Sequence, residues 1–325
     1  MAAPGKNNLI TDIDGIRVGN AEDHNALTGT TVILCDEPAI AAVAVAGGGP
    51  GTRETDLLGA GTLVDAVDAI VLSGGSSYGL GAADGVAAML GASGRGYGLV
   101  TRQGVPKAPI VPAAILYDLA NGGDKSWGET PPYNALGKTA FNAAAKMFHL
   151  GQAGAGLGAR AGKHRGGLGS ASIVTDDGLS VGAIAGVNCY GSTYIPQTKA
   201  FWAHPFEIES EFGGVRPPVD IVFDAEDWGD AKTNPQLGQN TTIACIATDV
   251  TLTPNEANRV AQMALSGFSR AIRPVFAPFD GDAVFVVSTG KMQLPSPGPL
   301  SLTRLGELAA NTLARAIARG VWEAQ

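Results

Sequence analysis

The sequence has few cysteines, few charged residues and no long apolar run, and each shortage excludes a class of protein. Three cysteines among 325 residues, none in a CxxC spacing, exclude a disulfide scaffold and a cysteine-ligated zinc site and favour a reducing compartment. Neither an apolar targeting segment nor a stretch of about 18 apolar residues is present, so we expect a cytoplasmic protein without a membrane segment. The formal net charge of −8 leaves no basic surface for nucleic acid.

Apolar residues and glycines are abundant instead. Apolar residues make up 45% of the chain, which is enough to bury a sizeable core in one large domain or two ordinary ones. We find no internal repeat, low-complexity tail or flexible linker, so we expect a single domain over residues 1–325. The 46 glycines predict tight turns and close approaches between backbone segments.

The spacing of apolar residues predicts a mixed chain of strands and helices. Strands are expected at 16–19, 30–35, 39–46, 69–73, 170–174, 181–189, 241–249 and 282–289, and helices at 80–90, 138–150, 254–272 and 302–322. The strands at 170–174 and 181–189 are expected to form a hairpin. Thr253 and Glu256 have the spacing of a capping box at a helix start. Residues 194–240 lack periodicity and are expected to form a long surface excursion.

The motif Gly75-Ser76-Ser77-Tyr78-Gly79 lies between a predicted strand and a predicted helix, where a nucleophile elbow would place Ser77 as the nucleophile. Such a triad needs a histidine late in the chain. The last of the four histidines is His204, so the final 121 residues contain none. A glycine-rich turn therefore explains the motif better than an elbow does.

A second candidate nucleophile, Thr241, lies where the irregular segment meets a predicted strand. If the chain were cut between Asn240 and Thr241, the threonine would carry its own α-amine, whose pKa near 8 suits deprotonation of the hydroxyl at neutral pH. No histidine would then be required. From spacing alone, however, an ordinary transition from loop to strand explains the threonines better, because threonine favours strands.

Four segments, taken together, favour Thr241 as a nucleophile over an ordinary transition from loop to strand. They are GGGPGTRETDLL at 47–58, SGGSSYG at 73–79, AIAGVNCYG at 183–191, and GQNTT at 238–242 with DGD at 280–282. In this order they resemble the self-processing N-terminal-nucleophile hydrolases of the DmpA/P1 type, which include D-aminopeptidases, β-peptidyl aminopeptidases and nylon-oligomer hydrolases. The resemblance implies an α+β fold built as a four-layer αββα sandwich. It also implies that the GxSxG loop shapes the site and does not supply the nucleophile.

The resemblance further implies that the chain cuts itself between Asn240 and Thr241. The pieces 1–240 and 241–325 would stay together as one αβ unit, and these units would form a homo-oligomer, a tetramer in the family. The aminopeptidase branch has a serine nucleophile and a downstream Ser-x-Glu pair. This chain has Thr241, Asp280 and Asp282 at those places, which favours the branch of endo-type 6-aminohexanoate-oligomer hydrolases.

Asp280 and Asp282 flank Gly281 at the start of a predicted strand, so their spacing directs both carboxylates to one side. There they could orient the hydroxyl and α-ammonium of Thr241. Two close carboxylates also raise each other's pKa, which helps one of them to hold or share a proton. Without the resemblance, Asp-Gly-Asp would be read as an ordinary turn.

The resemblance assigns roles to three more residues. Asn188 would donate its amide to the oxyanion, Lys163 would supply a fixed positive charge, and Tyr117 would lie beside the scissile carbonyl. Each also has an ordinary structural interpretation: a cap at a strand end, a solvated loop lysine and a packed aromatic ring.

We therefore expect an amide hydrolase in which Thr241 attacks the carbonyl and forms an ester that water then hydrolyses, with no metal or cofactor. The expected substrate is a small amide or peptide-like molecule, with 6-aminohexanoate oligomers as the first choice. An aminopeptidase for small, D- or β-amino-acid N-termini is the alternative within this class. An unprocessed binding protein with the same fold is the alternative from another class.

Overall fold

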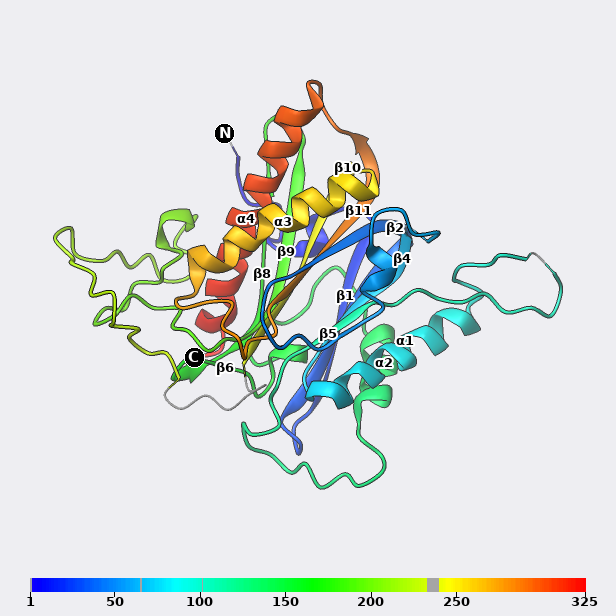
Figure 1. Cartoon of the computed structure of the whole chain (residues 1–325), viewed down its shortest axis with the longest axis horizontal. Helices are drawn as coiled ribbons and strands as arrows, with labels where there is room; N and C mark the ends of the chain where they lie inside the picture. Colours follow the sequence, from blue (N-terminus) through cyan, green and yellow to red (C-terminus); the bar gives the residue numbers. More distant parts are fainter. Residues whose placement is uncertain (1, 65, 101, 233–239) are drawn as a thin grey trace.

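The strands of the chain pair into one large sheet, seen in the computed structural model, which describes residues 2–64, 66–100, 102–232 and 240–325 (Figure 1). The sheet order is β3-β5-β4-β2-β11-β10-β9-β8, and β1 pairs with β2 beside this path. The strands are β1 Ile16–Asp23, β2 Thr28–Val45, β3 Thr52–Arg53, β4 Ala66–Ser73, β5 Ala113–Ile115, β8 Gly167–Val174, β9 Ser180–Asn188, β10 Thr241–Thr251 and β11 Ala283–Gln293. Two short strands, β6 Arg160–Ala161 and β7 His164–Arg165, pair separately.

The strand residues alternate between two faces, and this alternation builds four layers. Val32 of β2 packs on one face with α1 (Gly81–Ala92) and α2 (Tyr133–Asn142), whereas Ile33 points to a middle cluster. Ile243 of β10 enters the same middle cluster from the other half of the sheet. Ala244 faces away from it, towards α3 (Pro254–Ala271) and α4 (Gly298–Trp322). The order of layers is therefore helix, strand, strand, helix, and the predicted αββα arrangement is confirmed.

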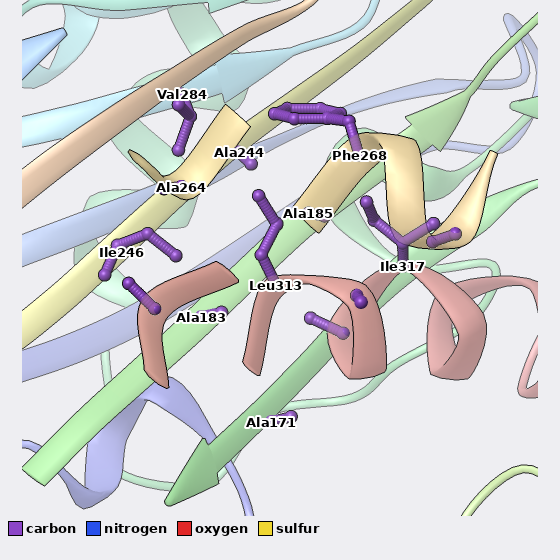
Figure 2. Close-up of a cluster of buried hydrophobic side chains, with 14 of the residues drawn as sticks. Ala171, Ala183, Ala185, Ala244, Ile246, Ala264, Phe268, Val284, Leu313 and Ile317 are labelled. Carbon is purple, nitrogen blue, oxygen red and sulfur yellow. The ribbon is translucent and has the colours of Figure 1, made fainter. Parts of the chain in front are cut away.

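Small residues allow α3 and α4 to lie close to the sheet (Figure 2). Alanines make up half of the strand residues in this cluster, and the helices contribute further alanines beside Phe268, Leu313 and Ile317, all three fully buried. Where α4 crosses β8, a Cβ on Gly169 would come within 1.9 Å of the Ala316 carbonyl oxygen. The predicted role of glycine in close backbone approaches is confirmed at this position.

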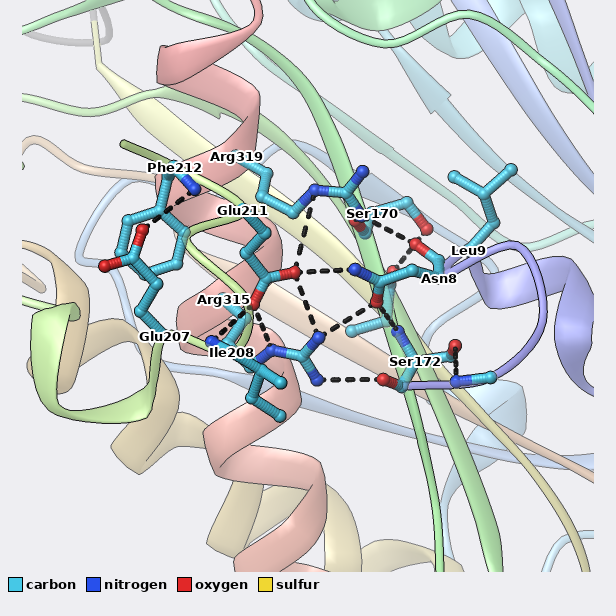
Figure 3. A network of polar contacts seen from close by, with 12 residues as sticks. Asn8, Leu9, Ser170, Ser172, Glu207, Ile208, Glu211, Phe212, Arg315 and Arg319 are labelled. Carbon is cyan, nitrogen blue, oxygen red and sulfur yellow. Dashed lines mark hydrogen bonds and ion pairs between the residues drawn. The ribbon is translucent and has the colours of Figure 1, made fainter. Parts of the chain in front are cut away.

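A buried polar network ties α4 to earlier parts of the chain (Figure 3). The Arg315 guanidinium pairs with the Glu211 carboxylate, and its Nη1 donates to the Ser172 carbonyl at 2.8 Å. Asn8 accepts from Arg315 Nη2 at 2.9 Å and donates to Glu211 at 2.7 Å. Arg319 Nη1 donates to the Asn8 carbonyl at 2.6 Å. The network thus joins the start of the chain, the irregular segment and the last helix.

Several local predictions are confirmed. β8 and β9 form the expected antiparallel hairpin, and Thr253 and Glu256 form the capping box at the start of α3. Among the described residues between 194 and 240, a single 3-10 turn (His204–Phe206) interrupts irregular structure. In the part of the chain that the structure describes, no helix is both long and apolar enough to span a bilayer.

The helix predicted at 138–150 is wrong in its bounds. The helix α2 ends at Asn142, and the backbone of Ala145 instead exchanges two hydrogen bonds of 3.0 Å with Val18 of β1. The two strands predicted at 30–35 and 39–46 are one continuous strand, β2, with an irregular register between Leu34 and Ala39. In both cases pairing with a distant strand overrides the local pattern.

Candidate active site

The ends of three neighbouring strands bring the predicted site residues together. β10 pairs antiparallel with β9, so that Thr241 lies opposite Asn188, and it pairs in parallel with β11. Just before the two parallel strands, Asn240 forms a bridge with Asp280. Residues that are far apart in the sequence therefore meet at one end of these three neighbouring strands.

The Thr241 side chain lies on the peptide bond that is predicted to be cut. Its hydroxyl donates a hydrogen bond to the Asn240 carbonyl oxygen, and the residue is 3% exposed. The backbone N–H of Gly281 donates to the same carbonyl oxygen at 3.3 Å. An N–H aimed at this oxygen would stabilise the negative charge that develops there during attack. Sequence reasoning missed this donor, because a backbone group leaves no residue-type signal.

The Asn240 side chain is buried, and its polar atoms have no hydrogen bond to the described part of the chain. Neither its Oδ1 nor its Nδ2 finds a partner among the described residues, and the residue is fully buried. A buried polar group without partners costs about 1–3 kcal/mol.

Gly281 is a position where only glycine fits. A Cβ there would lie 2.7 Å from Thr241 Oγ1 and 3.0 Å from the Gly49 carbonyl oxygen. The glycine run around Gly49 also holds the backbone of the acidic pair: Gly49 N donates to Asp280 O at 2.7 Å, and Ala46 N donates to Asp282 O at 3.0 Å. The first family segment thus packs directly on the Asp-Gly-Asp motif.

Asp280 and Asp282 are both buried beside Thr241. Asp282 accepts from Thr242 N at 2.6 Å and from Phe276 N at 3.3 Å, and Asp280 Oδ2 accepts from Ala277 N at 3.1 Å. Burial raises the pKa of both carboxyls. The Asp280 charge raises the pKa of Asp282 further, whereas the Ala277 N–H and the Lys232 ammonium oppose the rise in the pKa of Asp280. The pair therefore holds a proton to higher pH than ordinary aspartates do.

Asn188 is fully buried in a fixed orientation. Its Nδ2 donates to the Tyr117 carbonyl at 2.9 Å, and its Oδ1 accepts from Asn121 Nδ2 at 3.1 Å and from Arg160 N at 2.9 Å. The predicted partners Asn188 and Tyr117 are thus neighbours, joined through the Tyr117 backbone. The Tyr117 ring belongs to a half-buried residue, and its predicted role stays a prediction.

The two lysines near the site differ in what they contact. The Lys163 side chain is 55% exposed, and its Nζ lies 3.8 Å from Asp230 Oδ1. Its contacts in the described chain therefore direct it to Asp230 and not to the acidic pair. Lys232, which sequence reasoning missed, donates from Nζ to the Asn188 carbonyl at 3.3 Å and lowers the pKa of Asp280. It lies in irregular sequence, without a motif to mark it.

The GxSxG loop forms a tight turn next to these residues. Gly75 has a φ of +87°, and a Cβ there would come within 2.0 Å of Tyr133 Cζ. Its N–H donates to the buried Asp118 carboxylate at 2.8 Å. Ser77 is exposed on the 3-10 helix Ser76–Leu80 that follows. The geometry fits the turn interpretation of this motif.

The three cysteines are buried free thiols. Burial raises the pKa of Cys35 and of Cys189 to about 12 and also raises the pKa of Cys245, so these thiols stay protonated at neutral pH. Within the described ranges, no three histidine, cysteine, aspartate or glutamate side chains gather as metal ligands would.

The chain matches a peptidase family and relatives named as aminopeptidases or as an oligomer hydrolase. Residues 8–325 match the model of peptidase family S58. An uncharacterized aminopeptidase of Mycobacterium bovis is 39% identical over 340 residues, which cover 98% of this chain and 94% of that protein. The 6-aminohexanoate-oligomer endohydrolase of a Kocuria species is 31% identical, over 96% of this chain and 86% of that protein. The resemblance inferred from the four segments is confirmed.

Solved structures show the same fold. A Burkholderia β-aminopeptidase matches 98% of this chain and 88% of its own, with a TM-score of 0.69 and 24% identity. The L-aminopeptidase D-Ala-esterase/amidase of Ochrobactrum anthropi, described as a variant of the N-terminal-nucleophile hydrolase fold, matches 98% of this chain and 87% of its own, with a TM-score of 0.68 and 18% identity. The expected fold class is confirmed.

Proposed function

Because the chain belongs to peptidase family S58, and is thus a hydrolase of amide or peptide bonds, we propose that it cuts itself before Thr241 and then uses this threonine as its nucleophile. The observation that carries the proposal is the position of the Thr241 hydroxyl. It contacts the Asn240 carbonyl, to which the Gly281 N–H also donates, beside two buried carboxylates.

The cut would proceed as an acyl shift from nitrogen to oxygen. Thr241 Oγ1 attacks the Asn240 carbonyl carbon while a carboxylate of the acidic pair takes the hydroxyl proton, and the Gly281 N–H stabilises the oxyanion. The C–N bond then breaks and its nitrogen takes the proton. Water hydrolyses the resulting ester, which leaves the Asn240 carboxylate and a free hydroxyl and α-amine on Thr241.

Hydrolysis of a substrate would repeat this chemistry with the new α-amine as the base. The amine takes the proton of the Thr241 hydroxyl, and the oxygen attacks the substrate carbonyl. The substrate C–N bond then breaks, the leaving amine takes the proton, and water hydrolyses the ester on Thr241 to release the acid product. Asp280 and Asp282 orient the hydroxyl and the amine, and Asn188 donates to the substrate oxyanion. No metal or cofactor takes part in these steps.

We propose a small amide as the substrate, with 6-aminohexanoate oligomers as the first choice. The Kocuria relative carries that activity in its name, and the Thr241 and Asp-Gly-Asp pattern favours the same branch. Release of single N-terminal residues from short peptides is the second candidate, because the more similar Mycobacterium relative is named an aminopeptidase. Product analysis separates them: internal cuts in 6-aminohexanoate oligomers support the first activity, and release of small, D- or β-amino acids supports the second.

Intact-mass measurement with N-terminal sequencing tests the cut. We expect a chain that begins Thr-Thr-Ile-Ala-Cys, two bands on a denaturing gel, and an αβ unit that assembles into a homo-oligomer of larger native mass. Thr241→Ala should stay uncut and inactive, and the matched variant Ser77→Ala should still be cut. A single full-length chain after prolonged incubation, or an uncut Ser77→Ala with a cut Thr241→Ala, would overturn the proposal.

A further inference from the structure

Lys232 is the last described residue before Asn240, and it is bound to the end of β9. Its backbone N–H donates to the Tyr190 carbonyl at 3.0 Å, and its Nζ donates to the Asn188 carbonyl at 3.3 Å. Asn188 is the residue that lies opposite Thr241 in the strand ladder. The ammonium therefore lies one strand away from the nucleophile.

Aromatic rings pack against one another near Lys232 and the acidic pair. The Trp228 ring lies edge-on to Tyr190 at 6.3 Å, and Tyr190 lies edge-on to Phe279 at 5.0 Å, next to Asp280 in the chain. Ala231 is also buried, at 5% exposed. These contacts join the segment that carries Lys232 to the loop that carries the acidic pair.

The charged groups around Lys232 come from three parts of the chain. Burial lowers the pKa of Lys232 to about 8, the charge of the Asp280 carboxylate opposes this, and the charge of Arg160 lowers the pKa further. The Lys232 charge in turn lowers the pKa of Asp280, and the Asp280 charge raises the pKa of Asp282. Lys232 is thus partly removed from water, and its charge acts on a carboxyl that is also buried.

We propose that Lys232 is a positioning residue for self-cleavage, whose ammonium keeps the Asp280 carboxylate ionised beside Thr241. The inference rests on the proposed function. It assigns to Lys232 the fixed positive charge that the family resemblance assigns to Lys163, because Lys163 contacts Asp230 instead. Lys232 itself does not touch the reacting atoms and acts through Asp280.

The positive charge of Lys232 matters most before the cut, when Thr241 has no α-amine of its own. Before the cut Thr241 has no α-amine, so a side chain must take its hydroxyl proton. A buried pair of carboxyls without a counter-charge takes up protons, and a protonated Asp280 cannot accept another. With Lys232 charged, the Asp280 carboxylate receives the proton as the Thr241 oxygen bonds to the Asn240 carbon, and it returns the proton to the Thr241 nitrogen as the C–N bond breaks.

The test is the rate of self-cleavage against pH, measured on full-length chain from cell-free synthesis. Lys232→Met should move the acid limb of this profile to higher pH by about one unit, which makes the cut about tenfold slower on the acid side and restores it at alkaline pH. Lys232→Arg, which keeps the charge, should stay near the wild-type profile. Lys146→Met is the matched control, since Lys146 Nζ also donates to backbone carbonyls, at 3.3 and 3.4 Å from Thr11 O and Ile13 O.

Two outcomes would overturn the inference. One is a wild-type profile for Lys232→Met. The other is an equal slowing of Lys232→Met and Lys232→Arg at every pH, which is the behaviour of a merely structural contact. Thermal melting in the uncut Thr241→Ala background shows whether each variant folds, and Lys232→Gln replaces Lys232→Met if the latter does not. If wild-type chain is cut and Lys232→Met behaves like it, this inference alone fails; if wild-type chain is never cut, the proposed function fails first.

Discussion

At the scale of single residues, the space around Thr241 is set by the absence of one side chain. A Cβ at position 281 would meet Thr241 Oγ1 at 2.7 Å and the Gly49 carbonyl oxygen at 3.0 Å. Gly281→Ala should therefore displace the hydroxyl from the Asn240 carbonyl. A misplacement of about 1 Å can cost about 100-fold in rate, so we expect uncut chain to accumulate on a gel time course.

The control for this prediction is Gly81→Ala. A Cβ at Gly81 meets nothing within 4 Å, so the same substitution there should leave the cut unchanged. Cutting of Gly281→Ala at the wild-type rate would show that the Thr241 hydroxyl does not need its present position.

The buried carboxyl of Asp282 links function to stability. The pKa of Asp282 is raised in the folded chain, whereas in the unfolded chain it has the ordinary aspartate value near 4. At any pH between these two pKa values, Asp282 is protonated in the folded chain and ionised in the unfolded chain. The stability contributed by this proton is present at low pH and is lost as the pH rises through that window.

Asp282→Asn removes this titration. In the uncut Thr241→Ala background, we expect the Tm of Asp282→Asn relative to its parent to rise by about 2 °C or more between pH 5 and pH 8.5. Differential scanning calorimetry across this range measures it. A difference that stays constant with pH would mean that Asp282 titrates at its ordinary value.

At the scale of elements, the sequence predicts structure well where the signal is local. The hairpin of β8 and β9 and the capping box of α3 depend on residues a few positions apart, and both are confirmed. The helix predicted at 138–150 extends too far because Ala145 pairs with Val18, and no local pattern contains that information. Long-range pairing sets the boundaries that periodicity cannot.

The residues of the candidate site also differ in whether a local pattern or a long-range contact sets their positions. Thr241, Asn188 and the Asp280–Asp282 pair stand at the ends of strands that the pattern predicts, and the structure brings them together. The direction of the Lys163 side chain depends on Asp230, which lies in the irregular segment, and the contact of Lys232 with Asn188 depends on the same segment. A motif can place a lysine in a loop but cannot say which carboxylate it meets.

At the scale of the whole molecule, the two predicted pieces share one core. β10 and β11 of the piece 241–325 lie between β9 and β2 of the piece 1–240, so a cut before Thr241 leaves a continuous sheet. The network of Figure 3 adds a buried ion pair across the same division: Arg315 is 2% exposed and Glu211 is 7% exposed. We expect these contacts to hold the pieces together after the cut.

Arg315→Met tests this expectation. The substitution leaves the buried Glu211 carboxylate with the neutral Asn8 Nδ2 donor at 2.7 Å and a single, longer ion pair of 3.8 Å to Arg319 Nε, and it leaves the Ser172 carbonyl without its Nη1 donor. Removing one partner of a buried ion pair costs about 3–5 kcal/mol, so the urea midpoint of the uncut Thr241→Ala chain should fall, and the cut protein should separate into its two pieces at lower urea.

Arg304→Met is the control, because the Arg304–Asp177 pair also joins α4 to the earlier chain but is exposed, at 45% and 48%. Screening by water makes that pair weak, so its loss should leave both measurements near the wild type. Equal midpoints for Arg315→Met and Arg304→Met would mean that the sheet alone, without the buried network, holds the two pieces together.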